Sequence, residues 1–79
     1  MAHKDWSEAV EDAVRRHVAR TGDRTFTRQA LIESELKQII NETGSVGATP
    51  DMTLSRELQQ LRDAGVLKFV NRGTYCLVG

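Results

Sequence analysis

The side chains most often used in catalysis are few in this chain and are not arranged for it. The only cysteine is Cys76 and the two histidines are His3 and His17, and their spacing matches no zinc site. The serines lack a histidine and an acid in a recognisable nucleophile setting, and Gly44-Ser45-Val46-Gly47 lacks the lysine of a phosphate-binding loop. We therefore expect no enzyme activity, no catalytic residue, no metal and no cofactor.

A second set of polar residues, between positions 53 and 63, is better suited to binding. Leu54, Leu58 and Leu61 recur at helical spacing and predict a buried seam. The opposite face of that helix carries Thr53, Arg56, Gln59, Gln60 and Asp63. Arginine pairs bidentately with guanine, glutamine pairs with adenine, and hydroxyls serve bases or phosphates, so this face is suited to reading DNA. A polar outward face is also typical of ordinary surface helices.

A β-hairpin is expected after this helix. The β-rich runs 66–70 and 74–78 flank a turn at Asn71-Arg72-Gly73. Lys68 on the first run, with Asn71 and Arg72 at the turn, would place cations near a phosphate backbone. The same residues are common in hairpin turns that bind nothing.

The preceding elements follow from the spacing of apolar residues. Between Trp6 and Val18 these residues recur every three or four positions, which predicts a helix that Thr21 and Gly22 end. A short strand over 24–27 would place Phe26 in the core. We expect Trp6 to pack in the core or against a partner, and we interpret three arginines at the end of this helix as a solvated face: Arg15, Arg16 and Arg20.

Two further helices are expected in the middle of the chain. An apolar stripe predicts a helix between Thr27 and Glu42, with Thr27 as its N-cap. The side chains expected on its outward side are Glu33, Glu35 and Lys37. The glycine-containing segment 43–48 predicts a loop, and Thr49-Pro50-Asp51 is a helix-start signal, so the third helix is expected over 50–64.

The order of these elements indicates a fold class. A helix, a short strand, two helices and a hairpin, with the short strand paired to the hairpin, predict an α+β winged helix-turn-helix. This fold has three helices, a C-terminal β-hairpin wing and a short third strand. Because 79 residues cannot bury two cores, we expect a single domain over 1–79. The second helix of a helix-turn-helix lies in the major groove, so helix 50–64 is the expected reader.

Net charge and hydropathy set limits on the partners. Eleven basic residues balance eleven acidic ones, and this zero net charge disfavours strong nonspecific binding to nucleic acid. No run approaches the roughly 18 apolar residues of a membrane span, and the N-terminal residues lack the layout of a signal peptide. We therefore expect a cytoplasmic protein with no membrane partner.

The segment from Leu58 to Tyr75 carries a family resemblance. Its pattern L-Q-x-L-R-D-x-G followed by R-G-x-Y resembles the C-terminal winged-helix domain of the Dam-replacing family, restriction endonucleases that act on adenine-methylated DNA. The resemblance extends more loosely to Phe26-Thr27 and the helix after them. It implies a helix that contacts the methylated site, with these residues at the bases: Thr53, Ser55, Arg56 and Gln59. The family's nuclease domain is absent here, so the resemblance implies a nuclease partner or a longer parent chain.

Two functions therefore stay open. The first is a double-stranded DNA-binding module that uses helix 50–64 and a wing around Arg72, with a role in a modification-dependent restriction system. The second is a protein-interaction or dimerisation module that uses Trp6 or the wing strands, which the zero net charge favours. The two differ in one property, because DNA binding weakens with salt through counterion release and an apolar protein contact does not.

Overall fold

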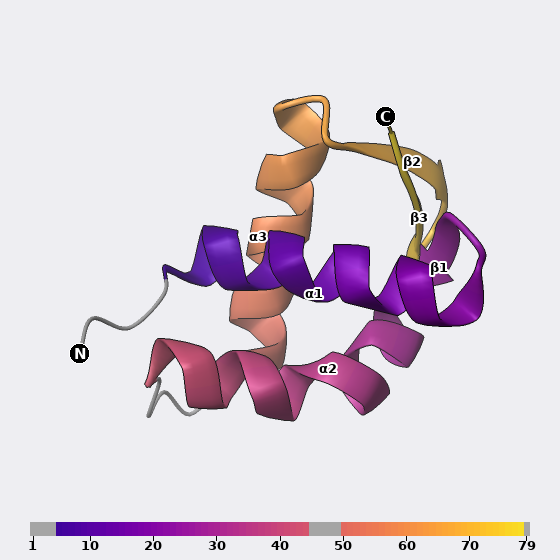
Figure 1. Ribbon diagram of the computed structural model, residues 1–79. Coiled ribbons are helices and arrows are strands. Elements are labelled where there is room, and N and C mark those ends of the chain that lie inside the picture. Colours follow the sequence, from indigo (N-terminus) through magenta and orange to yellow (C-terminus); the bar gives the residue numbers. More distant parts are fainter. Residues whose placement is uncertain (1–4, 45–49, 79) are drawn as a thin grey trace.

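Three helices and three strands follow one another in the expected order in the computed structural model, which describes residues 5–44 and 50–78 (Figure 1). The elements are α1 (Trp6–Thr21), β1 (Thr25–Thr27), α2 (Arg28–Thr43), α3 (Pro50–Asp63), β2 (Leu67–Asn71) and β3 (Thr74–Leu77). The sheet is antiparallel with the order β1-β3-β2, so β1 pairs with the hairpin through β3. This is a winged-helix arrangement, and the predicted α+β fold class is confirmed.

Local signals set the helix ends. The Thr27 hydroxyl accepts a hydrogen bond of 3.0 Å from the amide of Ala30 and caps α2, as predicted. Gly65 follows α3 with a φ of 84°, a left-handed conformation that other residues adopt at a cost. As a result α3 ends at Asp63, one residue earlier than expected. His3 and the predicted cap Thr49 lie outside the described residues.

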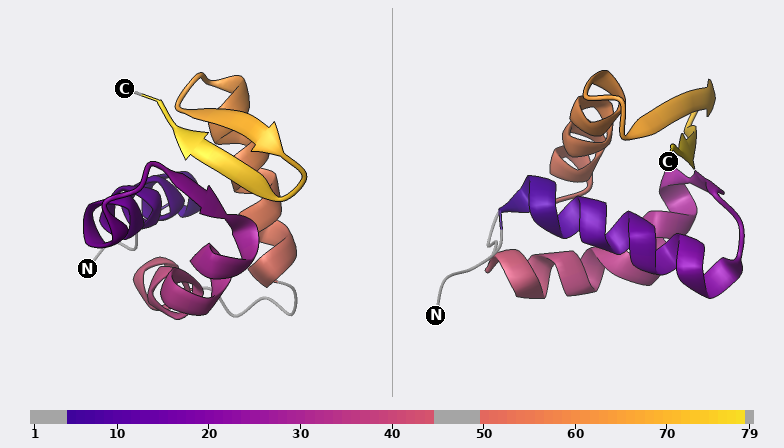
Figure 2. Two further views of the ribbon diagram at one scale, coloured as in Figure 1. Left: turned by 90° about the vertical axis from the view of Figure 1, so that its right-hand side faces the viewer. Right: turned by 45° about the horizontal axis from the view of Figure 1, so that its top comes forward.

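One hydrophobic core draws side chains from every element. The seam of α3, formed by Leu54, Leu58 and Leu61, is buried as its spacing predicts. Phe26 from β1 is buried too, and Trp6 is partly buried against this core. Helix α3 contacts α1, α2 and β2, and Figure 2 shows the hairpin β2–β3 lying beside α3. The opposite side of α3 is therefore left to solvent.

Three aromatic rings line the inner face of the sheet. Cross-strand pairing places Tyr75 between Phe26 and Phe69. The Phe26 and Tyr75 rings are stacked with centroids 6.1 Å apart, and the Phe69 ring meets Tyr75 edge-on at the same distance. The register shifts after Phe69, so Val70 is an extra residue that forms a bulge in β2.

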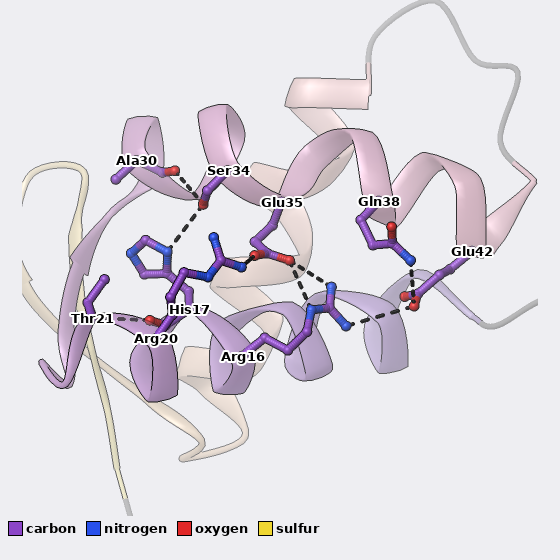
Figure 3. Close-up of polar contacts among 9 residues, drawn as sticks. All are labelled: Arg16, His17, Arg20, Thr21, Ala30, Ser34, Glu35, Gln38 and Glu42. Carbon is purple, nitrogen blue, oxygen red and sulfur yellow. Dashed lines mark hydrogen bonds and ion pairs between the residues drawn. The ribbon is translucent and has the colours of Figure 1, made fainter.

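The main departure from the sequence prediction is Glu35, which is buried instead of facing outward. Its side chain is 2% exposed and lies between two arginines of α1 (Figure 3). Oε1 accepts hydrogen bonds from Nε and Nη2 of Arg16, at 3.0 and 2.7 Å, and Oε2 accepts one from Arg20. Arg16 also lies 3.8 Å from the carboxylate of Glu42. The predicted solvated face is thus wrong for Arg16, which is half-buried against this carboxylate, whereas Arg20 is 57% exposed as predicted and also pairs with the carboxylate.

The third arginine of that group behaves as predicted. Arg15 is exposed and forms a surface ion pair of 3.2 Å with Glu11, one helical turn away. Consecutive helical residues point about 100° apart, so Arg15 and Arg16 face different surroundings. The helix α1 therefore presents arginines both to solvent and to α2.

Candidate nucleic-acid interface

The exposed face of α3 carries the predicted base-reading residues. Arg56, Gln59 and Gln60 are exposed, as is Asp63 at the end of the helix, and Thr53 is half-buried. Residues three or four positions apart are neighbours on a helix surface, so the Arg56 side chain lies beside both glutamines. The buried leucine seam holds this face toward solvent. The structure thus brings one guanidinium and two amides together on a single exposed helix face.

Ser55 is placed differently from the other predicted residues. It is half-buried, its hydroxyl accepts a hydrogen bond from Nε of Arg28, and it donates to the carbonyl of Asp51 at 3.2 Å. Arg28 also donates from Nη2 to that carbonyl at 3.4 Å, and the same nitrogen lies 3.7 Å from the Asp51 carboxylate. The Ser55 hydroxyl therefore helps to hold α2 and α3 together.

Arg28 was missed by the sequence reasoning, although it joins three elements. Its side chain binds Asp51 and Ser55 of α3, and its backbone amide donates to the carbonyl of Gly73 in the wing turn at 2.8 Å. No local spacing reveals these contacts, because they depend on how α2 packs against α3 and the hairpin. Arg28 thus fixes the wing turn relative to the first turns of α3.

Replacing Arg28 with alanine is expected to lower the free energy of unfolding by about 1–2 kcal/mol. The variant removes the side-chain contacts to Ser55 and Asp51 but keeps the backbone bond to Gly73. Urea unfolding followed by circular dichroism measures the change. The control is Arg24→Ala, an exposed arginine just before β1, for which a change within about 0.5 kcal/mol is expected. Equal stability of the two variants would contradict this role of Arg28.

The hairpin presents its predicted cations to solvent. Lys68 and Arg72 are both exposed. Asn71 is exposed as well, but its Oδ1 accepts a hydrogen bond of 2.8 Å from the backbone amide of Arg72 and so closes the turn. The structure therefore gives Asn71 a part in shaping the wing and leaves the two cations facing outward.

Charge is distributed unevenly although its total is zero. The hairpin from Val66 to Val78 contains two basic residues and no acidic one. Together with α3 and Arg28 it holds five basic side chains, Arg28, Arg56, Arg62, Lys68 and Arg72, against three acidic ones, Asp51, Glu57 and Asp63. The rest of the described chain has five basic side chains, Arg15, Arg16, Arg20, Arg24 and Lys37, against eight acidic ones, Asp5, Glu8, Glu11, Asp12, Asp23, Glu33, Glu35 and Glu42. The positive excess thus lies on the wing and on Arg28 of α2, because α3 itself has two basic and three acidic side chains.

The three acidic residues of α3 are either paired with an arginine or half-buried. Asp51 pairs with Arg28, Asp63 pairs with Arg62 at 3.3 Å, and Glu57 is half-buried. In the part of the chain that the structure describes, no acid forms an ion pair with any of the three remaining cations, Arg56, Lys68 and Arg72. These three cations are available to an anionic ligand.

The histidine and the cysteine that the structure describes, His17 and Cys76, are both at least partly buried in the fold. His17 is buried, with Nδ1 3.2 Å from the hydroxyl of Ser34 and its ring against Phe26. Cys76 is half-buried on β3. Within 5–44 and 50–78, no three histidine, cysteine or acidic side chains are grouped to hold a metal ion. The helices described there are also too short or too polar to span a membrane.

Comparison with known proteins adds no relative to this picture. No protein-family model matches the chain, and no match was found among curated proteins or solved structures.

Proposed function

We propose that this chain is a double-stranded DNA-binding module that reads the major groove with α3 and contacts phosphates with the wing. One observation carries the proposal: α3 exposes Arg56, Gln59 and Gln60, and the hairpin that packs beside α3 has two exposed cations and no acidic residue. A helix of this kind fits the width of the major groove, and flanking cations fix its register on the phosphate backbone.

The side chains divide between reading and positioning. Arg56 has the two parallel donors that match guanine O6 and N7, and Gln59 and Gln60 have the donor and acceptor that match adenine. Lys68 and Arg72 contact phosphates, which adds affinity without sequence preference. Ser55 supports the interface from inside through Arg28, so we assign it to positioning and not to base contact.

The kind of DNA that the module binds is proposed from the family resemblance. An adenine-methylated duplex is the proposed ligand, and the chain would serve as the recognition part of a modification-dependent restriction system. Cleavage would come from a nuclease partner or a parent nuclease chain. The module itself supplies binding and orientation and no chemistry.

The variant Arg56→Ala tests the assignment of α3 as the reader. It is expected to weaken binding to the preferred duplex about 5- to 150-fold and to relax the preference at one base pair, since a bidentate contact contributes about 1–3 kcal/mol. Fluorescence anisotropy with duplexes containing GATC, unmethylated and adenine-methylated, measures both effects. The matched control is Lys37→Ala, a cation removed from the exposed side of α2. If the two variants bind equally well, α3 does not read the bases.

A second candidate function is a protein-interaction or dimerisation module. It is favoured by the position of β2, which is an edge strand that exposes apolar side chains. Its other proposed anchor is weaker, because Trp6 packs against the core. Binding that is indifferent to salt and to added duplex would favour this candidate.

A further inference from the structure

The wing exposes more apolar surface than its contacts with the rest of the fold require. Phe69 is 48% exposed, and Val70 and Val78 are 53% and 48% exposed. Among the described residues, Met52 on α3 is the only other large hydrophobic side chain so strongly exposed. The exposed apolar surface of the described chain is therefore concentrated on the hairpin.

The exposure of Phe69 follows from its place in the sheet. It shares the inner face with Tyr75 and Phe26, which are 7% and 3% exposed. Phe69 instead lies on the edge strand β2, where Leu67 is buried and the residues after it are exposed. One side of its ring meets Tyr75, and the rest of the ring is open to a ligand.

The charges around Phe69 indicate the chemistry of that ligand. Lys68 precedes it and points to the opposite face of the strand, Arg72 lies in the turn three residues later, and the hairpin has no acidic residue. An exposed apolar ring on an edge strand, with one cation on the other face of the strand and one in the turn, complements a groove whose apolar deoxyribose and base edges lie between two phosphate backbones. A second copy of this chain is a poorer match, because a two-fold contact through β2 would bring Lys68 and Arg72 near the same cations of the other copy.

We propose that Phe69, with Val70 beside it, packs against deoxyribose and base edges in a groove of duplex DNA while Lys68 and Arg72 hold the flanking phosphates. This inference rests on the proposed function and adds a second kind of contact to it. An apolar contact releases no counterions, so its contribution to affinity does not depend on salt. The bulge at Val70 places an extra apolar residue next to Phe69 in β2 and so enlarges the exposed apolar surface there.

The variants Phe69→Ala and Phe69→Leu test the contact, with Val78→Ala as a control of the same exposure at the other end of the hairpin. Phe69→Ala is expected to weaken duplex binding about tenfold, with the slope of log K against log salt concentration unchanged. Phe69→Leu keeps an apolar side chain, so its affinity for the duplex is expected to fall less than about threefold. Val78→Ala is expected to bind like the original chain. Thermal unfolding of each variant shows whether a loss of binding follows from unfolding.

A second readout follows the DNA itself. A duplex with 2-aminopurine in the groove region is expected to become brighter on binding, because a ring pressed against base edges disturbs their stacking, and Phe69→Ala should abolish the change. Binding of folded Phe69→Ala as tight as that of the original chain would overturn the inference and leave the proposed function standing. Sedimentation that shows a dimer broken by Phe69→Ala, with DNA affinity unchanged, would also overturn it. If the original chain binds no duplex, the proposed function itself fails.

Discussion

Replacing Arg16 with alanine is expected to lower the free energy of unfolding by about 3 kcal/mol. The change removes the hydrogen bonds of 3.0 and 2.7 Å that Oε1 of Glu35 accepts and leaves Arg20 to compensate the carboxylate. Glu35 is 2% exposed and Arg16 is 37% exposed, so only Arg20 and water that enters the space left by the truncated side chain can compensate the carboxylate. A chain of this length is stable by roughly 5–10 kcal/mol, so the loss is a large part of the total.

Urea unfolding of Arg16→Ala and Arg15→Ala measures this effect with a matched control. Arg15 is the neighbouring residue, and its exposed pair with Glu11 is expected to contribute at most about 0.5 kcal/mol. The double variant Arg16→Leu, Glu35→Leu removes both charges and is expected to recover most of the stability, because apolar groups of similar volume suit this position. If Arg16→Ala is as stable as Arg15→Ala, the buried pair does not stabilise the fold.

The double variant Lys68→Ala, Arg72→Ala is expected to lose both affinity for DNA and part of its salt dependence. Each phosphate contact contributes about 0.9 to the slope of log K against log salt concentration, so the slope should decrease by about 1.8. Affinity at low salt should fall at least about tenfold, and by the same factor for every duplex sequence, because phosphates carry no sequence information. Anisotropy titrations at four salt concentrations measure the slope.

The control for this prediction removes the same charge from the other side of the molecule. Arg15 and Lys37 are exposed on α1 and α2, and replacing both with alanine also lowers the net charge by two. If the wing contacts phosphates, the control keeps the original slope. Equal changes in slope for the two double variants would show that only the net charge matters and that the wing has no special place in the interface.

The fold could be predicted because its signals are local. The seam of α3 repeats at helical spacing, Thr27 caps α2 and Gly65 ends α3, and each of these signals acts within a few residues. The position of Glu35 was predicted wrongly because residue type was given more weight than spacing. Glu35 lies four residues after Leu31 and four before Ile39, in the middle of the buried stripe of α2.

The candidate site could be predicted only in part. The exposure of Arg56, Gln59 and Gln60 follows from the helical period of α3 and is confirmed. The engagement of Ser55 by Arg28 joins residues 27 positions apart, so it depends on tertiary packing that a single sequence does not specify. The acid-free hairpin can be read from the sequence, whereas the position of Arg28 beside α3 depends on tertiary packing.

The most direct test of the central claim is the affinity of the original chain for duplex DNA as a function of salt concentration. The duplexes contain GATC with and without adenine methylation. We expect binding whose log K falls linearly with log salt concentration, with a slope near −1.8 if Lys68 and Arg72 each contact a phosphate at about 0.9 per contact, and with tighter binding to the methylated duplex. Absence of binding at tens of micromolar protein, or an affinity that salt does not change, would contradict the account.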